Sequence, residues 1–344
     1  MLFSTGEGLG KYLRANLGQG GAKGMKQSFD KGQAVGLVCA LASSLLFGFS
    51  FLANRVGVSE ISPFSLLGWR LSMAFISMHI CVVLGLFKVD FRGKPLMPLL
   101  LMGLTNPILN FTGELLGLKL TSASEGGAIL SCIPIVTLLF MPLISREYPT
   151  RRQWASIILS VAGVIIIGAA KMAGPTFNIM GYVFLLGAAL SGGLFLNLCR
   201  RFTQYTEVER IYAITAIGAV FFSAAALVEN GLRGTLQEYL LLPIQKPGLF
   251  AGILYLAVGC SAAGFTLQNI AVTRLGLGRT GSFTALSNLI GVMSGVIFLK
   301  EGFSLLQGVG TVLVLLGVYG ANSLPLHARR AVSVPSTLSS EEEK

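Results

Sequence analysis

Charged residues are scarce in this chain. Asp, Glu, Lys and Arg make up 12% of its 344 residues, against about 25% in typical soluble domains, and its mean hydropathy is +0.73. Too few charges remain to solvate the surface of one or two water-exposed domains of this length. The composition therefore excludes a soluble fold and indicates an integral membrane protein.

Residues that do chemistry in enzymes and pumps are also scarce. Only two histidines occur, and the chain contains no His-Glu-x-x-His, no Gly-x-Ser-x-Gly and no phosphate-binding Walker loop. We therefore expect neither an enzyme nor a primary pump, and no cofactor or metal site. The five cysteines never form a Cys-x-x-Cys pair, so we interpret them as small buried hydrophobic residues: Cys39, Cys81, Cys132, Cys199 and Cys260.

Long apolar segments are abundant. A helix needs about 20 apolar residues to cross a bilayer, whereas barrel strands are about ten residues long and alternate in polarity. The sequence predicts an all-α fold of ten transmembrane helices, with a small surface element in the 230–247 link. The expected spans are 33–53, 64–87, 95–117, 124–145, 153–171, 178–199, 209–229, 248–272, 280–299 and 303–323.

The two ends of the chain differ from the rest. Residues 1–32 are glycine-rich and basic and lack the apolar core of a signal peptide. We expect a disordered basic extension there, and either Met1 or Met25 is the native start. The polar tail 324–344 is also predicted to be disordered.

Basic residues lie mostly on alternate loops. Of the 26 Lys and Arg, 19 fall at the N-terminus and on loops of the same side, 6 on the other side, and Arg70 within a span. Positive charge stays cytoplasmic, so we expect both termini inside and the protein in the plasma membrane. The net charge of +11 is spread over many loops rather than gathered in a patch, which argues against nucleic-acid binding.

The chain repeats itself at a shift of 154 residues. "FTGELLG" (111–117) falls on "FTLQNIA" (265–271), and both halves carry the pattern [R/K]-E-x5-Q-x9-G-V, which pairs Glu147 with Glu301 and Gln153 with Gln307. Each half has five predicted helices. Because five is odd, the second half must enter the membrane from the opposite side, which is the inverted-repeat design of many carriers.

These motifs resemble those of a known family. The repeated junctions, together with "SPFSLLGWRLSMAF" and "LTSASEGGAILSCIPIVTLLF", are similar to the EamA repeats of the drug/metabolite transporter superfamily. The resemblance covers about 33–323. It implies two inverted five-helix repeats, 33–171 and 178–323, and movement of small metabolites, often outward, through a cavity between them.

The resemblance does not name a substrate. We expect a small polar or zwitterionic metabolite, such as an amino acid or a related compound, carried by alternating access. A non-transport membrane sensor or a lipid-handling protein on the same duplicated fold is the alternative. The sequence leaves the direction, the coupling ion and the oligomeric state open.

Two opposite charges lie at comparable depth in adjacent predicted helices. Charges within spans are candidate functional sites, and pairing offsets the cost of burying either. We expect Arg70 and Glu114 to pair, either as a structural bridge or as a site where a substrate amine or a coupling proton binds Glu114. Gln268 replaces Glu114 in the second half, an asymmetry that favours a substrate with unlike ends. Further candidates for the cavity are Asn110, Thr112, Gln268 and Asn288.

Glu147 and Glu301 lie at helix junctions. A carboxylate there favours the dipole of a helix N-terminus. We interpret both as structural caps of the helix that follows each of them in the chain.

Overall fold

The computed structural model describes residues 31–144, 148–172, 177–275 and 277–323. Within these ranges the chain is helical and contains no strand. The predicted disordered tail 324–344 and almost all of the extension 1–32 lie outside the described residues. The first described helix, α2, begins at Lys31.

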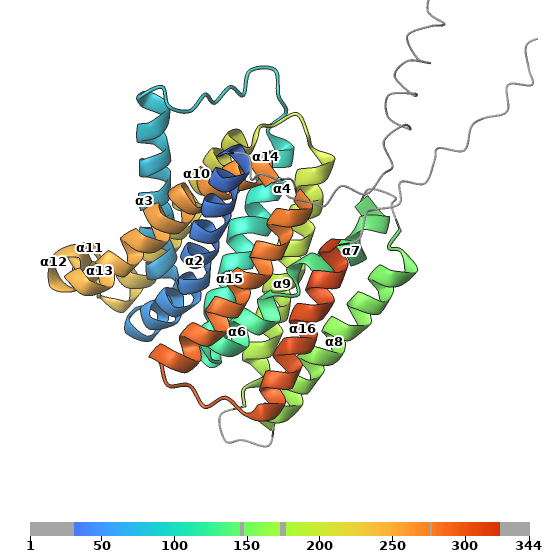
Figure 1. The fold of residues 1–344 in the computed structure, drawn as a ribbon. Coiled ribbons are helices and arrows are strands. Elements are labelled where there is room, and N and C mark those ends of the chain that lie inside the picture. Colours follow the sequence, from blue (N-terminus) through green and yellow to red (C-terminus); the bar gives the residue numbers. More distant parts are fainter. Residues whose placement is uncertain (1–30, 145–147, 173–176, 276, 324–344) are drawn as a thin grey trace, which may run out of the picture.

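The helices of the first half, coloured blue to green in Figure 1, form one bundle with those of the second half. Their bounds are α2 Lys31–Glu60, α3 Pro63–Val83, α4 Met97–Gly103, η1 Leu104–Leu109, α5 Asn110–Leu120, α6 Ala123–Leu130, α7 Ile133–Ile144 and α8 Arg151–Met172. Most expected spans agree with these bounds within a few residues. The first does not, since α2 runs on to Glu60 and stops just before Ser62, whose hydroxyl caps α3.

The second half follows a similar order. Its helices are α9 Ile179–Arg201, α10 Glu207–Arg233, α11 Leu236–Leu240, α12 Leu242–Gln245, α13 Pro247–Leu254, η2 Tyr255–Gly264, α14 Phe265–Leu275, α15 Leu277–Phe298 and α16 Leu305–Ser323. The short helices α11 and α12 occupy the 230–247 link, so the expected small surface element is confirmed.

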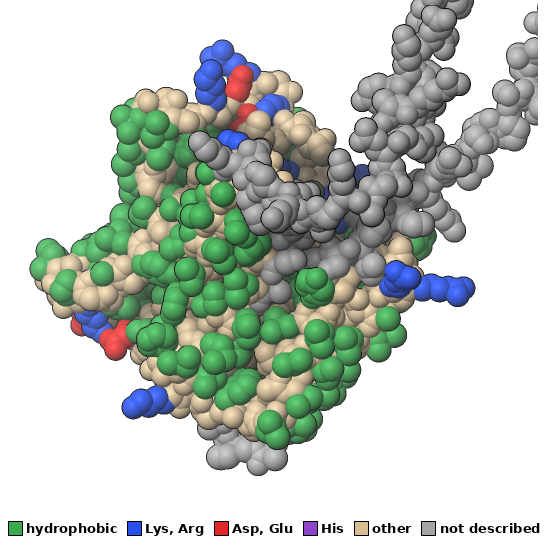
Figure 2. Space-filling view, in the orientation of Figure 1, with side chains coloured by type: hydrophobic (Ala, Val, Ile, Leu, Met, Phe, Trp, Pro, Cys, Tyr) green, Lys and Arg blue, Asp and Glu red, His purple; other side chains and the backbone are tan. Residues whose placement is uncertain are grey.

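The helices carry an apolar exterior. Seven described helical segments are long and apolar enough to cross a membrane, and shorter apolar helices cover Leu286–Phe298 and Leu305–Ala321. Figure 2 shows hydrophobic side chains across the visible face, with Lys, Arg, Asp and Glu gathered at its periphery. A contiguous apolar surface of this extent is stable in contact with lipid rather than with water.

The third helix of each half contains a π-helical segment. In the first half, the π-helical segment η1 separates α4 from α5, and Asn106 has non-helical dihedrals (φ −145°, ψ 114°). In the second half, η2 separates α13 from α14. A single long helix was expected at each place; the first is kinked at Asn106, whereas the second continues through η2 as one helical segment, Pro247–Leu275. Pro107 lacks a backbone N–H and interrupts the regular hydrogen bonding of the first. π-Helical segments are frequent at functional sites.

The repeated glutamines cap helices. The Thr150 N–H donates to Gln153 Oε1 (2.9 Å), and the Gln153 N–H donates to Thr150 Oγ1 (3.3 Å). Ser304 and Gln307 exchange the same two bonds at 2.9 and 3.2 Å. Each pair is a capping box. The glutamine of the duplicated pattern therefore starts the last helix of its half, α8 or α16.

The repeated glycines bring α8 and α16 into contact. A Cβ on Gly163 would lie 2.6 Å from the carbonyl oxygen of Gly310, and one on Gly317 would lie 2.6 Å from that of Ser156. Ser160 Oγ donates to the Val314 carbonyl across the same contact at 3.2 Å. The duplicated pattern therefore marks a close helix–helix contact, where small residues let two backbones approach.

Candidate functional site

A buried polar cluster joins three helices of the first half. Asn54 Nδ2 on α2 donates to Glu114 Oε1 on α5 at 2.8 Å. Arg70 Nη1 on α3 donates to Asn54 Oδ1 at 3.2 Å. Asn54 is 1% exposed and Arg70 6% exposed, whereas Glu114 is partly buried. The three side chains form an Arg70–Asn54–Glu114 chain, which we call the amide-bridged cluster.

The order of the cluster follows from its chemistry. A side-chain amide has an acceptor oxygen and donor hydrogens, so it fits between a guanidinium, which only donates, and a carboxylate, which only accepts. Arg70 is held from one face as well, since its Cζ lies 4.6 Å from the centre of the Phe111 ring on α5. Such cation–π contacts stabilise a cation that is removed from water.

The expected direct ion pair between Arg70 and Glu114 is therefore wrong. The two residues meet, as expected from their depth, but Asn54 lies between them. Sequence reasoning missed Asn54 because the first expected span, 33–53, ends one residue before it. The sequence signal for Asn54 is a side-chain amide in an apolar helix. It lies about two turns before the end of α2, near the start of α3.

Within the described part of the chain, none of the other expected site residues is hydrogen-bonded to the cluster. Asn110 is buried, and its Nδ2 donates to the Ala188 carbonyl on α9 at 2.7 Å, which ties α5 to α9. Thr112 and Gln268 are partly buried and Asn288 is buried. Gln268 and Asn288 lie on α14 and α15, and both of these helices pack against α2.

Glu301 is a cap, but not of the helix that was expected. Its carboxylate accepts from the backbone N–H groups of Ala123 (2.7 Å) and Ser124 (2.9 Å), and from Ser124 Oγ (2.6 Å). These donors belong to the first turn of α6, so the cap joins the two halves of the chain. The following helix α16 uses its own capping box, which leaves Glu301 free for α6. Glu147 lies outside the described residues.

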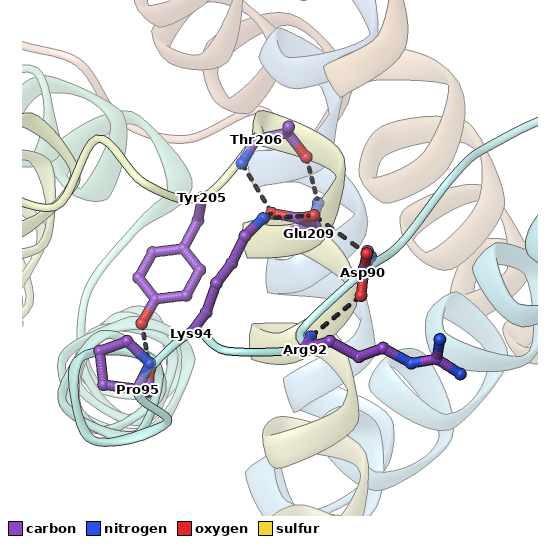
Figure 3. A network of polar contacts seen from close by, with 7 residues as sticks. All are labelled: Asp90, Arg92, Lys94, Pro95, Tyr205, Thr206 and Glu209. Carbon is purple, nitrogen blue, oxygen red and sulfur yellow. Dashed lines mark hydrogen bonds and ion pairs between the residues drawn. The ribbon is translucent and has the colours of Figure 1, made fainter.

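A second polar network lies at the opposite end of α3 (Figure 3). Lys94 Nζ donates to both carboxylate oxygens of Glu209, at 2.8 and 2.6 Å, and the Asp90 N–H donates to the same carboxylate at 3.2 Å. Glu209 also completes a capping box with Thr206 at the start of α10. This network anchors the connection between α3 and α4 to α10.

An apolar groove lies on the helical bundle. It has a volume of about 980 Å³ and lies between α3, α4 and α10, with Glu229 as its one charged lining residue. Among the described residues, no group of three or more His, Cys, Asp or Glu could hold a metal ion. Cys39, Cys132 and Cys260 are buried, as expected, whereas Cys81 and Cys199 are partly exposed.

Apolar helices, paired π-helical segments and buried opposite charges define a class: a multi-pass membrane protein with a polar site inside its helical bundle. Comparison with known proteins identifies the family. The family described as "EamA-like transporter family" matches residues 34–169 and 179–323. The chain belongs to this family, within the drug/metabolite transporter superfamily, and is a membrane transporter of that type.

Several relatives support the assignment. An uncharacterized transporter YcxC of Bacillus subtilis is 32% identical over 84% of this chain and 93% of its own. A probable amino-acid metabolite efflux pump of Salmonella typhimurium is 23% identical over 86% of this chain and 97% of its own. A solved crystal structure aligns with 84% of this chain and 96% of its own, with a TM-score of 0.54 and 16% identity. That likeness shows the fold alone.

Proposed function

We propose that this protein is a secondary transporter that exports a small polar or zwitterionic metabolite, such as an amino acid or a related compound, by alternating access. The amide-bridged cluster carries the proposal. Arg70 and Asn54 are removed from solvent inside an apolar bundle, and such groups in membrane proteins mark substrate or ion pathways. Glu114 is the residue where a substrate amine or a coupling proton binds.

We further propose an architecture of ten transmembrane helices in two inverted repeats, 33–171 and 178–323. In this arrangement α4–η1–α5 and α13–η2–α14 are the third helices of the two repeats. The helix contacts support it, since α2 packs against α14 as α5 packs against α9, and α3 meets η2 as α10 meets η1. The contacts of α8 with α16 are also reciprocal, because Gly163 meets Gly310 while Gly317 meets Ser156.

The kink at Asn106 and the π-helical segment η2 support the alternating-access mechanism. In many carriers built from inverted repeats, the substrate site lies at discontinuous helices near the interface of the repeats. Here α5 of the first repeat and η2 of the second both pack against α2, which carries Asn54. In our proposal both termini are cytoplasmic and the membrane is the plasma membrane. Asn110, Thr112, Gln268 and Asn288 complete the lining around Arg70 and Glu114.

Counterflow in proteoliposomes tests this function. Vesicles containing the purified protein are preloaded with an unlabelled solute, and uptake of the labelled solute is followed without an applied ion gradient. Exchange requires a carrier, so accumulation above that of empty vesicles is expected for at least one metabolite class. Folded protein that exchanges no amino acid, nucleoside or sugar derivative would favour the sensor or lipid-handling alternative. The names of the relatives make amino acids the first class to test.

A further inference from the structure

The Arg70 guanidinium makes only some of the hydrogen bonds that it can donate. Nη1 donates to Asn54, whereas Nε is buried and has no hydrogen-bond partner within the described part of the chain. Phe111 covers one face of the group but does not accept from its edges. A buried donor without an acceptor is costly, and native proteins rarely leave one. Because Nη1 is used by Asn54, the edge left to bind a carboxylate through two parallel hydrogen bonds is the one formed by Nε and Nη2.

The Glu114 carboxylate also accepts fewer hydrogen bonds than it can. Oε1 accepts from Asn54, and within the described residues no donor reaches Oε2. The cluster therefore leaves one donor, Arg70 Nε, and one acceptor, Glu114 Oε2, without hydrogen-bond partners among the described residues. Asn54 keeps them apart, because its amide occupies the place where the guanidinium and the carboxylate would otherwise pair and cancel.

The cluster has a direction, with its positive end on α3 and its negative end on α5. The second half has no equivalent cluster. Gln268 stands where the first half has Glu114. A shift of 144 residues aligns the first helices of the two halves, and it places Leu198 at the position of Asn54. A single directional site suits a solute with unlike charged ends better than a symmetric one.

We propose that the amide-bridged cluster is a two-ended receptor for a zwitterion, with Asn54 as the positioning residue that sets the spacing of its charges. The inference rests on the proposed transport function and names its recognition chemistry. The solute's carboxylate binds the Nε and Nη2 edge of Arg70, and its ammonium group donates to Oε2 of Glu114. A solute that lacks either charge leaves one end of the receptor unpaired and binds more weakly.

Charge-matched competitors test this receptor. Proteoliposomes preloaded with the twenty unlabelled amino acids take up a radiolabelled mixture of the same twenty. The best competitor among them is then compared with its own methyl ester, which lacks the carboxylate, and its N-acetyl derivative, which lacks the ammonium group. We expect the free amino acid to compete at least about tenfold better than either derivative.

The variants separate recognition from structure. Arg70→Gln should abolish discrimination against the methyl ester and keep that against the N-acetyl derivative, and Glu114→Gln should do the reverse. Asn54→Ala should weaken both discriminations, because the two charges are then free to pair directly. Asn197→Ala is the matched control, since Asn197 is a buried amide that donates to the Thr137 and Gly193 carbonyls away from the cluster. It should leave the ranking of competitors unchanged.

Several outcomes would overturn the receptor. If the ranking of the competitors is unchanged in all variants of the cluster, the amide-bridged cluster is a structural bridge only. Exchange of another solute class without any amino acid would reject the receptor and leave the transport function standing. If no solute exchanges, the transport function fails, and binding is measured by the rise in melting temperature that a ligand of the folded state causes. No rise with any of the twenty would then reject the receptor too.

One further variant keeps the proposal testable if the single substitutions prevent folding. A single substitution leaves the remaining charge buried alone, which is the costly case. The double variant Arg70→Gln, Glu114→Gln removes both charges and should fold. We expect it to discriminate against neither derivative, and preserved discrimination would contradict the proposal.

Discussion

The contact between α8 and α16 offers a sharp test of the duplicated pattern, because glycine is required there by space rather than by backbone conformation. We consider Gly163→Ala and Gly317→Ala, each of which adds one methyl group. The added Cβ at position 163 would lie 2.6 Å from the Gly310 carbonyl oxygen and 2.8 Å from the Val314 nitrogen. Both contacts are with backbone, so no side-chain rotation relieves them and the two helices must separate.

The loss of stability caused by the clash is measured against a matched control. Gly187 on α9 is exposed, and a Cβ there would meet nothing within 4 Å. Ala is favoured over Gly within a helix by about 1 kcal/mol, and all three substitutions gain this preference. The difference between them therefore isolates the clash, and overpacking by one methyl group costs about 1–3 kcal/mol. We expect Gly163→Ala and Gly317→Ala to be less stable than Gly187→Ala by that amount.

Thermal unfolding in one detergent at one protein concentration measures the difference. Trp154 on α8 lies close to this contact along the helix and provides a fluorescence signal. Gly187→Ala should unfold at or above the temperature of the unmodified chain, and the other two variants below it by similar amounts. If all three variants unfold at the same temperature, α8 and α16 do not pack as described, and the reciprocal contact that supports inverted repeats is lost.

Other predictions concern topology, the chain ends and the cap between halves. Glu238→Cys should react with a membrane-impermeant maleimide on intact cells, whereas Arg92→Cys should react only after lysis; reversed labelling would contradict the proposed orientation. Deleting 1–24 and 329–344 should preserve insertion and uptake, and loss of folded protein would show that an end docks. Glu301→Ala should lower the free energy of unfolding by about 2 kcal/mol, and Glu301→Gln by less, as followed by melting in detergent; equal stability of all three would refute the cap.

Composition and periodicity were sufficient for the class of the protein and the position of most helices. Scarce charge and long apolar runs are properties of each segment, and the bilayer imposes nearly the same length on every crossing. The repeat at 154 residues was also readable, because both copies must satisfy the same local need: a capping box at Gln153 or Gln307 and a small residue at Gly163 or Gly317.

Partners distant in the chain were decided by tertiary structure alone. Sequence reasoning brought Arg70 and Glu114 to the same depth but missed the amide between them, and it assigned Glu301 to the wrong helix. Depth follows from counting along a helix, whereas the direction in which a side chain faces depends on how each helix rotates and where it breaks. The kink at η1, the π-helical segment η2 and the packing of α2, α3 and α5 set those directions. The spacing between the two buried charges, on which the proposed recognition of a zwitterion depends, is therefore a property of the packed bundle.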